Sequence, residues 1–118
     1  MKIDNVDKAL QVFSDSAIEH AKATAEGDHI IANNNHDLIV LSAKYLRQKN
    51  LIRELSKFFN HDNIGVRIWA ATFSLEENEN KAKEILKEIS QKHIAHHSFT
   101  AEMTLEEWNC GNLKLPYE

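Results

Sequence analysis

The sequence predicts an all-α fold, with about six helices arranged in antiparallel pairs, because apolar residues recur at three- and four-residue steps. Glycine and proline are also scarce: the 118 residues contain 3 glycines and 1 proline, whereas strands joined by tight turns require more of both. Apart from Gly65, these residues fall where predicted helices end, at Gly27, Gly111 and Pro116. A chain of this length can bury one core but hardly two, so residues 1–118 are expected to form a single domain.

The first predicted helix spans residues 5–26, where apolar residues recur along one face. Asp4 or Asn5 can cap its start, since their side chains accept hydrogen bonds from exposed backbone amides. Gly27 suits the left-handed position that closes a helix, and Asp28 can cap the next one. So short a link predicts that the first two helices are antiparallel neighbours.

The second predicted helix covers residues 28–49. Its apolar face is predicted to consist of Ile31, Leu38, Leu41 and Tyr45. Asn34 falls on the same face, within a run of asparagines that form helix poorly because their amides compete for backbone hydrogen bonds. The run is expected either to bend the helix or to supply buried hydrogen bonds, so Asn34 is assigned a structural role.

Two further helices are predicted in the middle of the chain. A short third helix runs from Leu51 to Phe59, and the turn-forming residues 60–63 end it. In the fourth helix, the apolar side chains of residues 66–75 cover two sides and leave little polar surface. The fourth helix is therefore predicted to be the innermost of the fold.

The fifth and sixth helices follow from the same signals. Residues 80–92 carry apolar side chains on one face, and glutamate and lysine pairs at four-residue spacing on the other. Ser98 can cap the sixth helix and Gly111 can close it. Residues 112–118 are expected to form an extended tail.

Residues 51–75 and 80–110 are each predicted to form a helix pair of about thirty residues, the length of a stacked helical repeat. The run from Asp62 to Leu75 resembles the second-helix signature of HEAT-like repeats. Its spacing predicts that Arg67, one turn into the helix, donates hydrogen bonds to the Asp62 carboxylate in the preceding turn. The alanines of this run would let a paired helix approach closely.

The wider pattern resembles a small bacterial family of helical domains, catalogued as domain of unknown function 2019, over residues 25–115. The resemblance rests on VRIWAA at 66–71, AKEIL at 82–86 and FTAEMTLEEWNCG at 99–111. It implies a HEAT-like, right-handed stack of helices and no established activity. Related short HEAT-like proteins often bind other proteins or act as immunity proteins encoded beside bacterial toxins.

The charge of the chain favours a basic or neutral protein partner over nucleic acid. The formal net charge is -4, arginines that could contact phosphate or guanine are few, and no run of lysines with interleaved aromatics occurs. Lysines lie within one helical turn of several glutamates, which also fits a plain solvated face. The candidate partner-binding residues are Glu76, Glu77, Glu79, Glu102, Glu106 and Glu107.

Cysteine use and hydropathy favour a cytoplasmic protein. Cys110 is the one cysteine, so no intrachain disulfide can form. Residues 1–8 lack the apolar core of a signal peptide, and no uncharged stretch is long enough to span a bilayer. The sequence leaves monomer and homodimer as open alternatives.

A histidine cluster offers the alternative of a metal site. His93, His96 and His97 have the spacing at which imidazoles of one helix share a metal ion, and Cys110 could add a ligand. The cluster falls at a helix junction, however, and no carboxylate motif such as HEXXH accompanies it. No metal or cofactor is therefore expected, and Cys110 is interpreted as a small packed hydrophobe.

Trp69 and Trp108 lie on predicted apolar stripes and are interpreted as core residues, although tryptophan is also a common anchor at interfaces. With Asp62 and Arg67 they make up the predicted structural residues. The sequence thus predicts a non-enzymatic protein-interaction module, of which an immunity protein neutralising a basic toxin is one form. The alternative is a small metal-binding enzyme or sensor that uses the histidine cluster.

Overall fold

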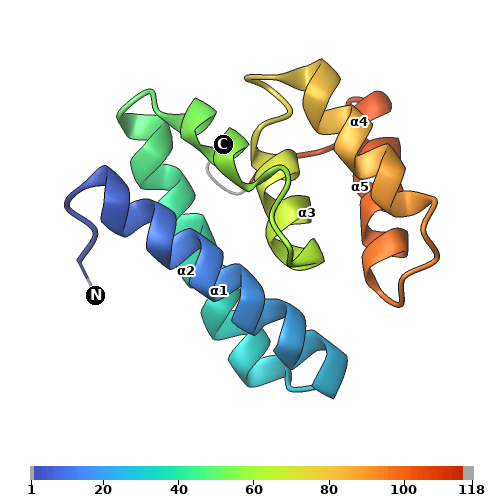
Figure 1. Cartoon of the computed structure of the whole chain (residues 1–118), viewed down its shortest axis with the longest axis horizontal. Helices are drawn as coiled ribbons and strands as arrows, with labels where there is room; N and C mark the ends of the chain where they lie inside the picture. Colours follow the sequence, from blue (N-terminus) through green and yellow to red (C-terminus); the bar gives the residue numbers. More distant parts are fainter. Residues whose placement is uncertain (1, 116–118) are drawn as a thin grey trace.

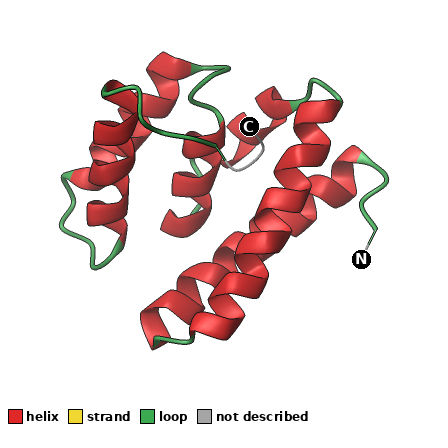
Figure 2. Cartoon of the chain, turned by 180° about the vertical axis from the view of Figure 1, so that it is seen from behind, coloured by secondary structure: helices red, strands yellow, loops and turns green. Residues whose placement is uncertain are grey.

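Five α-helices and one 3₁₀ helix make up the fold in the computed structural model, which describes residues 2–115 (Figures 1 and 2). The predicted all-α fold class is confirmed, and no strand occurs within this range. Pro116 and the last residues of the predicted tail lie outside the described residues. The elements are α1 (Val6–Glu26), α2 (His29–Gln48), the 3₁₀ helix η1 (Ile52–Phe58), α3 (Ile64–Phe73), α4 (Glu79–Ser90) and α5 (His97–Asn109).

The predicted signals at the corner between α1 and α2 are confirmed. The Asn5 side chain accepts a hydrogen bond from the backbone amide of Lys8 at 2.8 Å, which caps α1. Gly27 closes α1 with a positive φ of 74°, and the Asp28 side chain accepts from the amide of Ile31 at 3.1 Å. The two helices consequently turn back on each other and lie side by side (Figure 1).

The face that α2 turns toward the core is only partly the predicted one. Leu38 and Tyr45 are half-buried, and Tyr45 packs against the core, but Ile31 and Leu41 are 45% and 43% exposed. Asn34 is exposed as well, so the alternative in which it supplies buried hydrogen bonds is wrong. The buried face instead consists of Ile39, Ser42, Ala43 and Leu46. Ile39 and Leu46 supply large fully buried side chains, and Ser42 and Ala43 between them are small.

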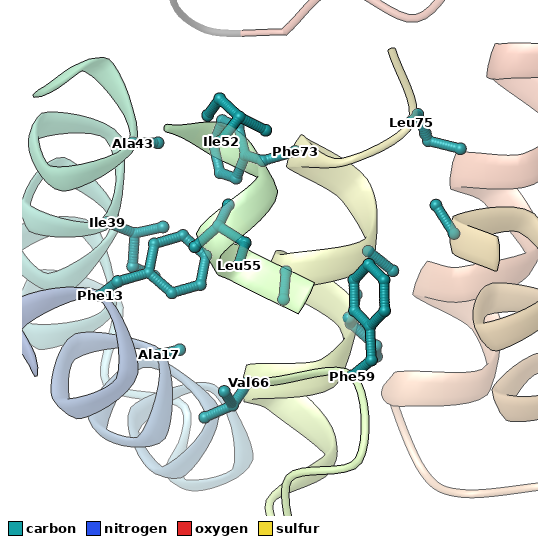
Figure 3. Packing of buried hydrophobic residues seen from close by; sticks show 14 of the residues in the cluster. Phe13, Ala17, Ile39, Ala43, Ile52, Leu55, Phe59, Val66, Phe73 and Leu75 are labelled. Atoms are coloured by element: carbon teal, nitrogen blue, oxygen red, sulfur yellow. The ribbon is translucent and has the colours of Figure 1, made fainter. Parts of the chain in front are cut away.

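Helix α3 is the innermost helix, as predicted. It contacts α1, η1, α4 and α5, and it lies between the α1–α2 pair and the α4–α5 pair (Figures 1 and 2). Val66 and Phe73 are fully buried. Phe73 meets the ring of Phe13 from α1 edge to face, with centroids 6.1 Å apart, so α1 and α3 share one core (Figure 3). The structure shows helix pairs, while the right-handed HEAT-like stack stays a prediction.

The buried Arg67 side chain joins three elements, but not through Asp62. Its Nε donates to the carbonyl oxygen of Phe59 at 2.8 Å, and its Nη2 lies 3.4 Å from a carboxylate oxygen of Glu88 on α4. Asp62 is exposed, and the side chain that caps α3 is that of the next residue, Asn63. The predicted hydrogen bond between Arg67 and Asp62 is therefore wrong, because Arg67 points toward the end of η1 and α4.

The start of α5 also differs from the prediction. The helix begins at His97, directly after His96, which has a positive φ of 65°. Ser98 does not cap it: its hydroxyl donates to the carbonyl oxygen of Ile89 and accepts from the amide of Ile94, both at 2.8 Å. Ser98 thus fastens the start of α5 to the end of α4. None of the helices in residues 2–115 combines the length and apolar character needed to cross a bilayer.

Candidate binding pocket

A pocket of about 230 Å³ lies where α1, α3 and α5 meet, at the C-terminal half of α1. Helix α3 lies between the other two helices in Figure 1. Segments far apart in the sequence therefore contribute to one site. The lining residues are His20, Ala21, Thr24 and Ala25 from α1; Gly65, Ile68, Trp69 and Thr72 from α3; and Ala95, His96, His97, Thr100 and Thr104 from the start of α5 and the loop before it.

Gly65 sets how closely α3 approaches α1 at one end of the pocket. A Cβ atom at this position would lie 2.9 Å from the Ala21 Cβ and 3.3 Å from the carbonyl oxygen of Ala17. The first of these separations is closer than real Cβ contacts, so only glycine fits without a shift of one helix. No role was predicted for Gly65, and its place inside a helix-forming, largely apolar run is the signal that could have identified it.

Trp69 lies against two histidine rings from the α1–α2 pair. Its ring centroid is 5.4 Å from that of His20 and 5.5 Å from that of His36, both in edge-to-face arrangements. A third neighbour, Phe73, stacks on Trp69 at 6.0 Å within α3. These contacts hold the indole in place, yet Trp69 is only half-buried and lines the pocket. The interpretation of Trp69 as a core residue is therefore only partly right.

Two of the histidines that line the pocket are held in their neutral form near neutral pH. Burial, and then the neighbouring His36 and His97, lower the pKa of His20. Burial, and then His96, lower the pKa of His97. Both effects favour the neutral imidazoles, whose ordinary pKa is about 6.5. Aspartate, glutamate, lysine and arginine are absent from the described lining residues, so the pocket suits an uncharged group.

Threonine hydroxyls add hydrogen-bond acceptors to the wall. The hydroxyl of Thr72 donates to the carbonyl oxygen of Ile68 at 2.7 Å. The hydroxyls of Thr100 and Thr104 each donate at 2.8 Å to the carbonyl oxygen four residues earlier, that of His96 and that of Thr100. Because each hydroxyl hydrogen is already used, the threonine oxygens can serve an occupant of the pocket only as acceptors.

The four residues of the alternative metal site do not all lie together in the structure. His96 and His97 line the pocket, whereas His93 is an exposed residue of the loop before α5, and Cys110 is exposed after the end of that helix. Nowhere in residues 2–115 do three or more histidine, cysteine, aspartate or glutamate side chains stand in an arrangement that could hold a metal ion. Cys110 follows the last residue of α5, and its side chain is exposed. The interpretation of Cys110 as a packed hydrophobe is therefore wrong.

The predicted acidic residues are all exposed and belong to different parts of the chain. Glu76 and Glu77 lie in a groove with Arg47 and Arg53, so both signs of charge occur there. Glu79 accepts a hydrogen bond from the indole nitrogen of the half-buried Trp108 at 2.6 Å, which connects α4 to α5. The remaining three glutamates, Glu102, Glu106 and Glu107, lie together on α5.

A shallow depression on the outer side of α5 adjoins the pocket. Phe99, Met103, Glu107 and Leu113 line it, and it shares Thr100 and Thr104 with the pocket. Phe99 is 66% exposed and Met103 is 37% exposed. We call Phe99, Met103 and Glu107 the α5 strip; they follow at four-residue spacing and therefore share one side of the helix. The partner-binding residues predicted from the sequence were all glutamates, and Phe99 and Met103 were not among them.

Comparison with known proteins supports the fold and assigns no activity. No protein-family model matches the chain, so membership of the domain of unknown function 2019 family stays a prediction. No curated protein matches it either. The chain is similar to the crystal structure of protein RPA1889 from Rhodopseudomonas palustris CGA009, with a TM-score of 0.88 and 22% sequence identity. The similarity covers 97% of this chain and 99% of that one, so the two proteins share the whole all-α fold.

Proposed function

We propose that this chain is a binding protein, with no catalysis of its own, that receives a basic amphipathic segment of a protein partner along α5. The observation that carries the proposal is the α5 strip, where Phe99 and Met103 are exposed one turn apart beside Glu107. Single exposed apolar residues are ordinary, but contiguous ones next to a pocket are typical of interaction sites. Thr100 and Thr104 line both the pocket and the depression beside the strip, so the strip and the pocket adjoin.

The charge on α5 is the second argument. Glu106 and Glu107 lie in the last turn of the helix, which carries no basic residue. A helix C-terminus has a partial negative charge, so a glutamate there disfavours the helix by about 0.3 to 1 kcal/mol. The stability of α5 therefore does not explain these glutamates, whereas lysines of a partner would compensate them. With a net charge of -4, the chain would also attract such a partner over a distance.

A labelled helical peptide tests this proposal by fluorescence anisotropy. The peptide carries leucines and one tryptophan on one face and lysines on the other, and a charge-reversed version has glutamate in place of every lysine. We expect the lysine peptide to bind, with an affinity that falls as salt increases, because close charge pairs are screened. The charge-reversed peptide should bind far more weakly.

Matched variants locate the binding on α5. Replacing both exposed apolar residues of the strip, Phe99→Ala with Met103→Ala, should weaken binding on the order of tenfold. The loss of stability should be small, because Phe99 is 66% exposed and Met103 is 37% exposed. The control is Ile30→Ala, which removes a 76% exposed side chain from α2. Equal binding of the two peptides, or an undiminished affinity of the double variant, would show that the proposal is wrong.

A further inference from the structure

The pocket and the α5 strip differ in what they can accept from the same partner. The strip carries Glu107, while the described residues that line the pocket include no carboxylate and no permanently charged cation. An isolated charge moved into an apolar pocket loses its hydration without compensation. A lysine of the partner therefore fits beside the strip and not in the pocket, which requires an uncharged side chain.

The volume of the pocket favours an aromatic ring. A dry cavity of about 150 Å³ is large enough to hold benzene. The present pocket, of about 230 Å³, leaves space for a fused ring or for a ring with a polar substituent. Trp69 and His20 meet at an interplanar angle of 89°, so a planar guest parallel to one ring is perpendicular to the other. Stacked and edge-to-face contacts are the two geometries that aromatic pairs prefer.

The hydrogen-bonding groups of the wall favour a guest that donates. Thr72, Thr100 and Thr104 have used their hydroxyl hydrogens on backbone carbonyls, which leaves acceptor oxygens. Neutral His20 and His97 each have one acceptor nitrogen as well. An indole N–H or a phenol O–H could satisfy one of these acceptors, whereas a phenylalanine or leucine side chain would leave it unsatisfied.

We infer that the pocket holds the indole or phenol ring of a tryptophan or tyrosine in the partner segment. This inference rests on the proposed function, since the ring belongs to the same segment that lies on the α5 strip. The ring is the anchor of the complex, and the lysines of the segment lie outside the pocket near Glu107. Tryptophan and tyrosine are also the side chains that most often dominate the affinity of an interface.

A series of peptides tests the inference by anisotropy. The lysine peptide is made with tryptophan, tyrosine, phenylalanine, leucine or lysine at its one aromatic position. We expect the phenylalanine peptide to bind about two- to tenfold more weakly than the tryptophan peptide, because it cannot make the hydrogen bond. The affinity of the leucine peptide should be lower by a further factor on the order of tenfold, because the aromatic contacts are lost. The lysine peptide should bind most weakly.

A variant of the pocket provides the matched control. Ala25 is an exposed pocket residue near the end of α1, and Ala25→Leu fills part of the pocket without disturbing the core. This variant should bind the tryptophan and leucine peptides equally. Gln11→Leu, also at an exposed position on α1 but outside the pocket, should keep the preference for tryptophan. Thermal unfolding of both variants confirms that they fold.

The outcomes separate this inference from the proposed function. If every peptide binds wild-type protein equally, and the Phe99 and Met103 variant still weakens all of them, the pocket inference is wrong and the proposed function stands. If no peptide binds, N-acetyltryptophanamide alone is titrated and followed by NMR. Chemical-shift changes around Trp69 that Ala25→Leu removes would support the pocket inference. Their absence would overturn it.

Discussion

The two halves of α1 have different surroundings. In the N-terminal half, Phe13 is fully buried, stacks on Phe58 at 5.9 Å and meets Phe73 edge to face. In the C-terminal half, Thr24 and Ala25 are exposed and His20 is half-buried beside the pocket. One helix therefore contributes to stability at one end and is available for binding at the other. Gly65 of α3 lies against Ala17 and Ala21, near the boundary between the halves.

The largest expected effect comes from the N-terminal half. Phe13→Ala should lower the free energy of unfolding by about 3 to 5 kcal/mol, because it removes a buried aromatic ring and leaves a cavity. Thr24→Ala, in the exposed half of the same helix, should leave the free energy of unfolding nearly unchanged. Urea unfolding monitored by circular dichroism measures both. Similar losses for the two variants would contradict the division of α1 into a stabilising and a binding half.

A smaller loss is expected at the boundary. Gly65→Ala should reduce the free energy of unfolding by about 1 to 3 kcal/mol, because the new Cβ forces α3 away from Ala21 and the backbone of Ala17. Since Gly65 lines the pocket, the same variant should also bind the tryptophan peptide less tightly, relative to the leucine peptide, than the wild-type protein does. A Gly65→Ala protein as stable as wild type, with its peptide preference intact, would show that the close approach at Gly65 is unimportant.

The smallest expected effect is a pH dependence of the free energy of unfolding, which arises from the histidines beside the C-terminal half of α1. Burial lowers the pKa of His20 and His97, so below about pH 6.5 the unfolded chain takes up protons more readily than the folded one. The free energy of unfolding should therefore be constant above this pH and decrease as the pH falls below it. Urea unfolding between about pH 7.5 and about pH 5.5 measures the slope and avoids the titration of carboxylates.

A pair of histidine variants identifies the source of this slope. His20→Gln should reduce it, and so should His97→Gln, because burial lowers the pKa of both histidines. Affinity for the tryptophan peptide should fall over the same range, because protonation places positive charge in the wall of the pocket. An unchanged slope in His20→Gln would assign the pH dependence to other groups.

Local signals predicted the helices well because they act over a few residues. The caps at Asn5 and Asp28, the closing glycine Gly27 and the all-round apolar character of α3 each depend on neighbours in the chain. The face of α2 was only partly predicted, because apolar side chains lie on more than one side of this helix. Leu41 is exposed, whereas Ile39 and Leu46 are fully buried, and packing against the other helices decides between them.

The pocket could not be predicted because no single segment contains it. His20, Trp69 and His97 come from three helices, and only the packing around α3 brings them together. The spacing of the histidine cluster in the sequence indicates a shared site, yet the fold places only His96 and His97 at the pocket. Of the glutamates predicted to bind a partner from the concentration of acidic residues, Glu107 lies on the α5 strip.

The hydrogen bond from Arg67 to the Phe59 carbonyl restricts how this protein can vary in length. The 3₁₀ helix η1 has weaker internal hydrogen bonds than an α-helix, and the guanidinium of α3 holds its end. Asn63 caps α3 on the other side of the same short loop. Insertions and deletions between Phe59 and Asn63 would separate the two attachments, so proteins of this fold that keep the arginine should keep the length of this loop.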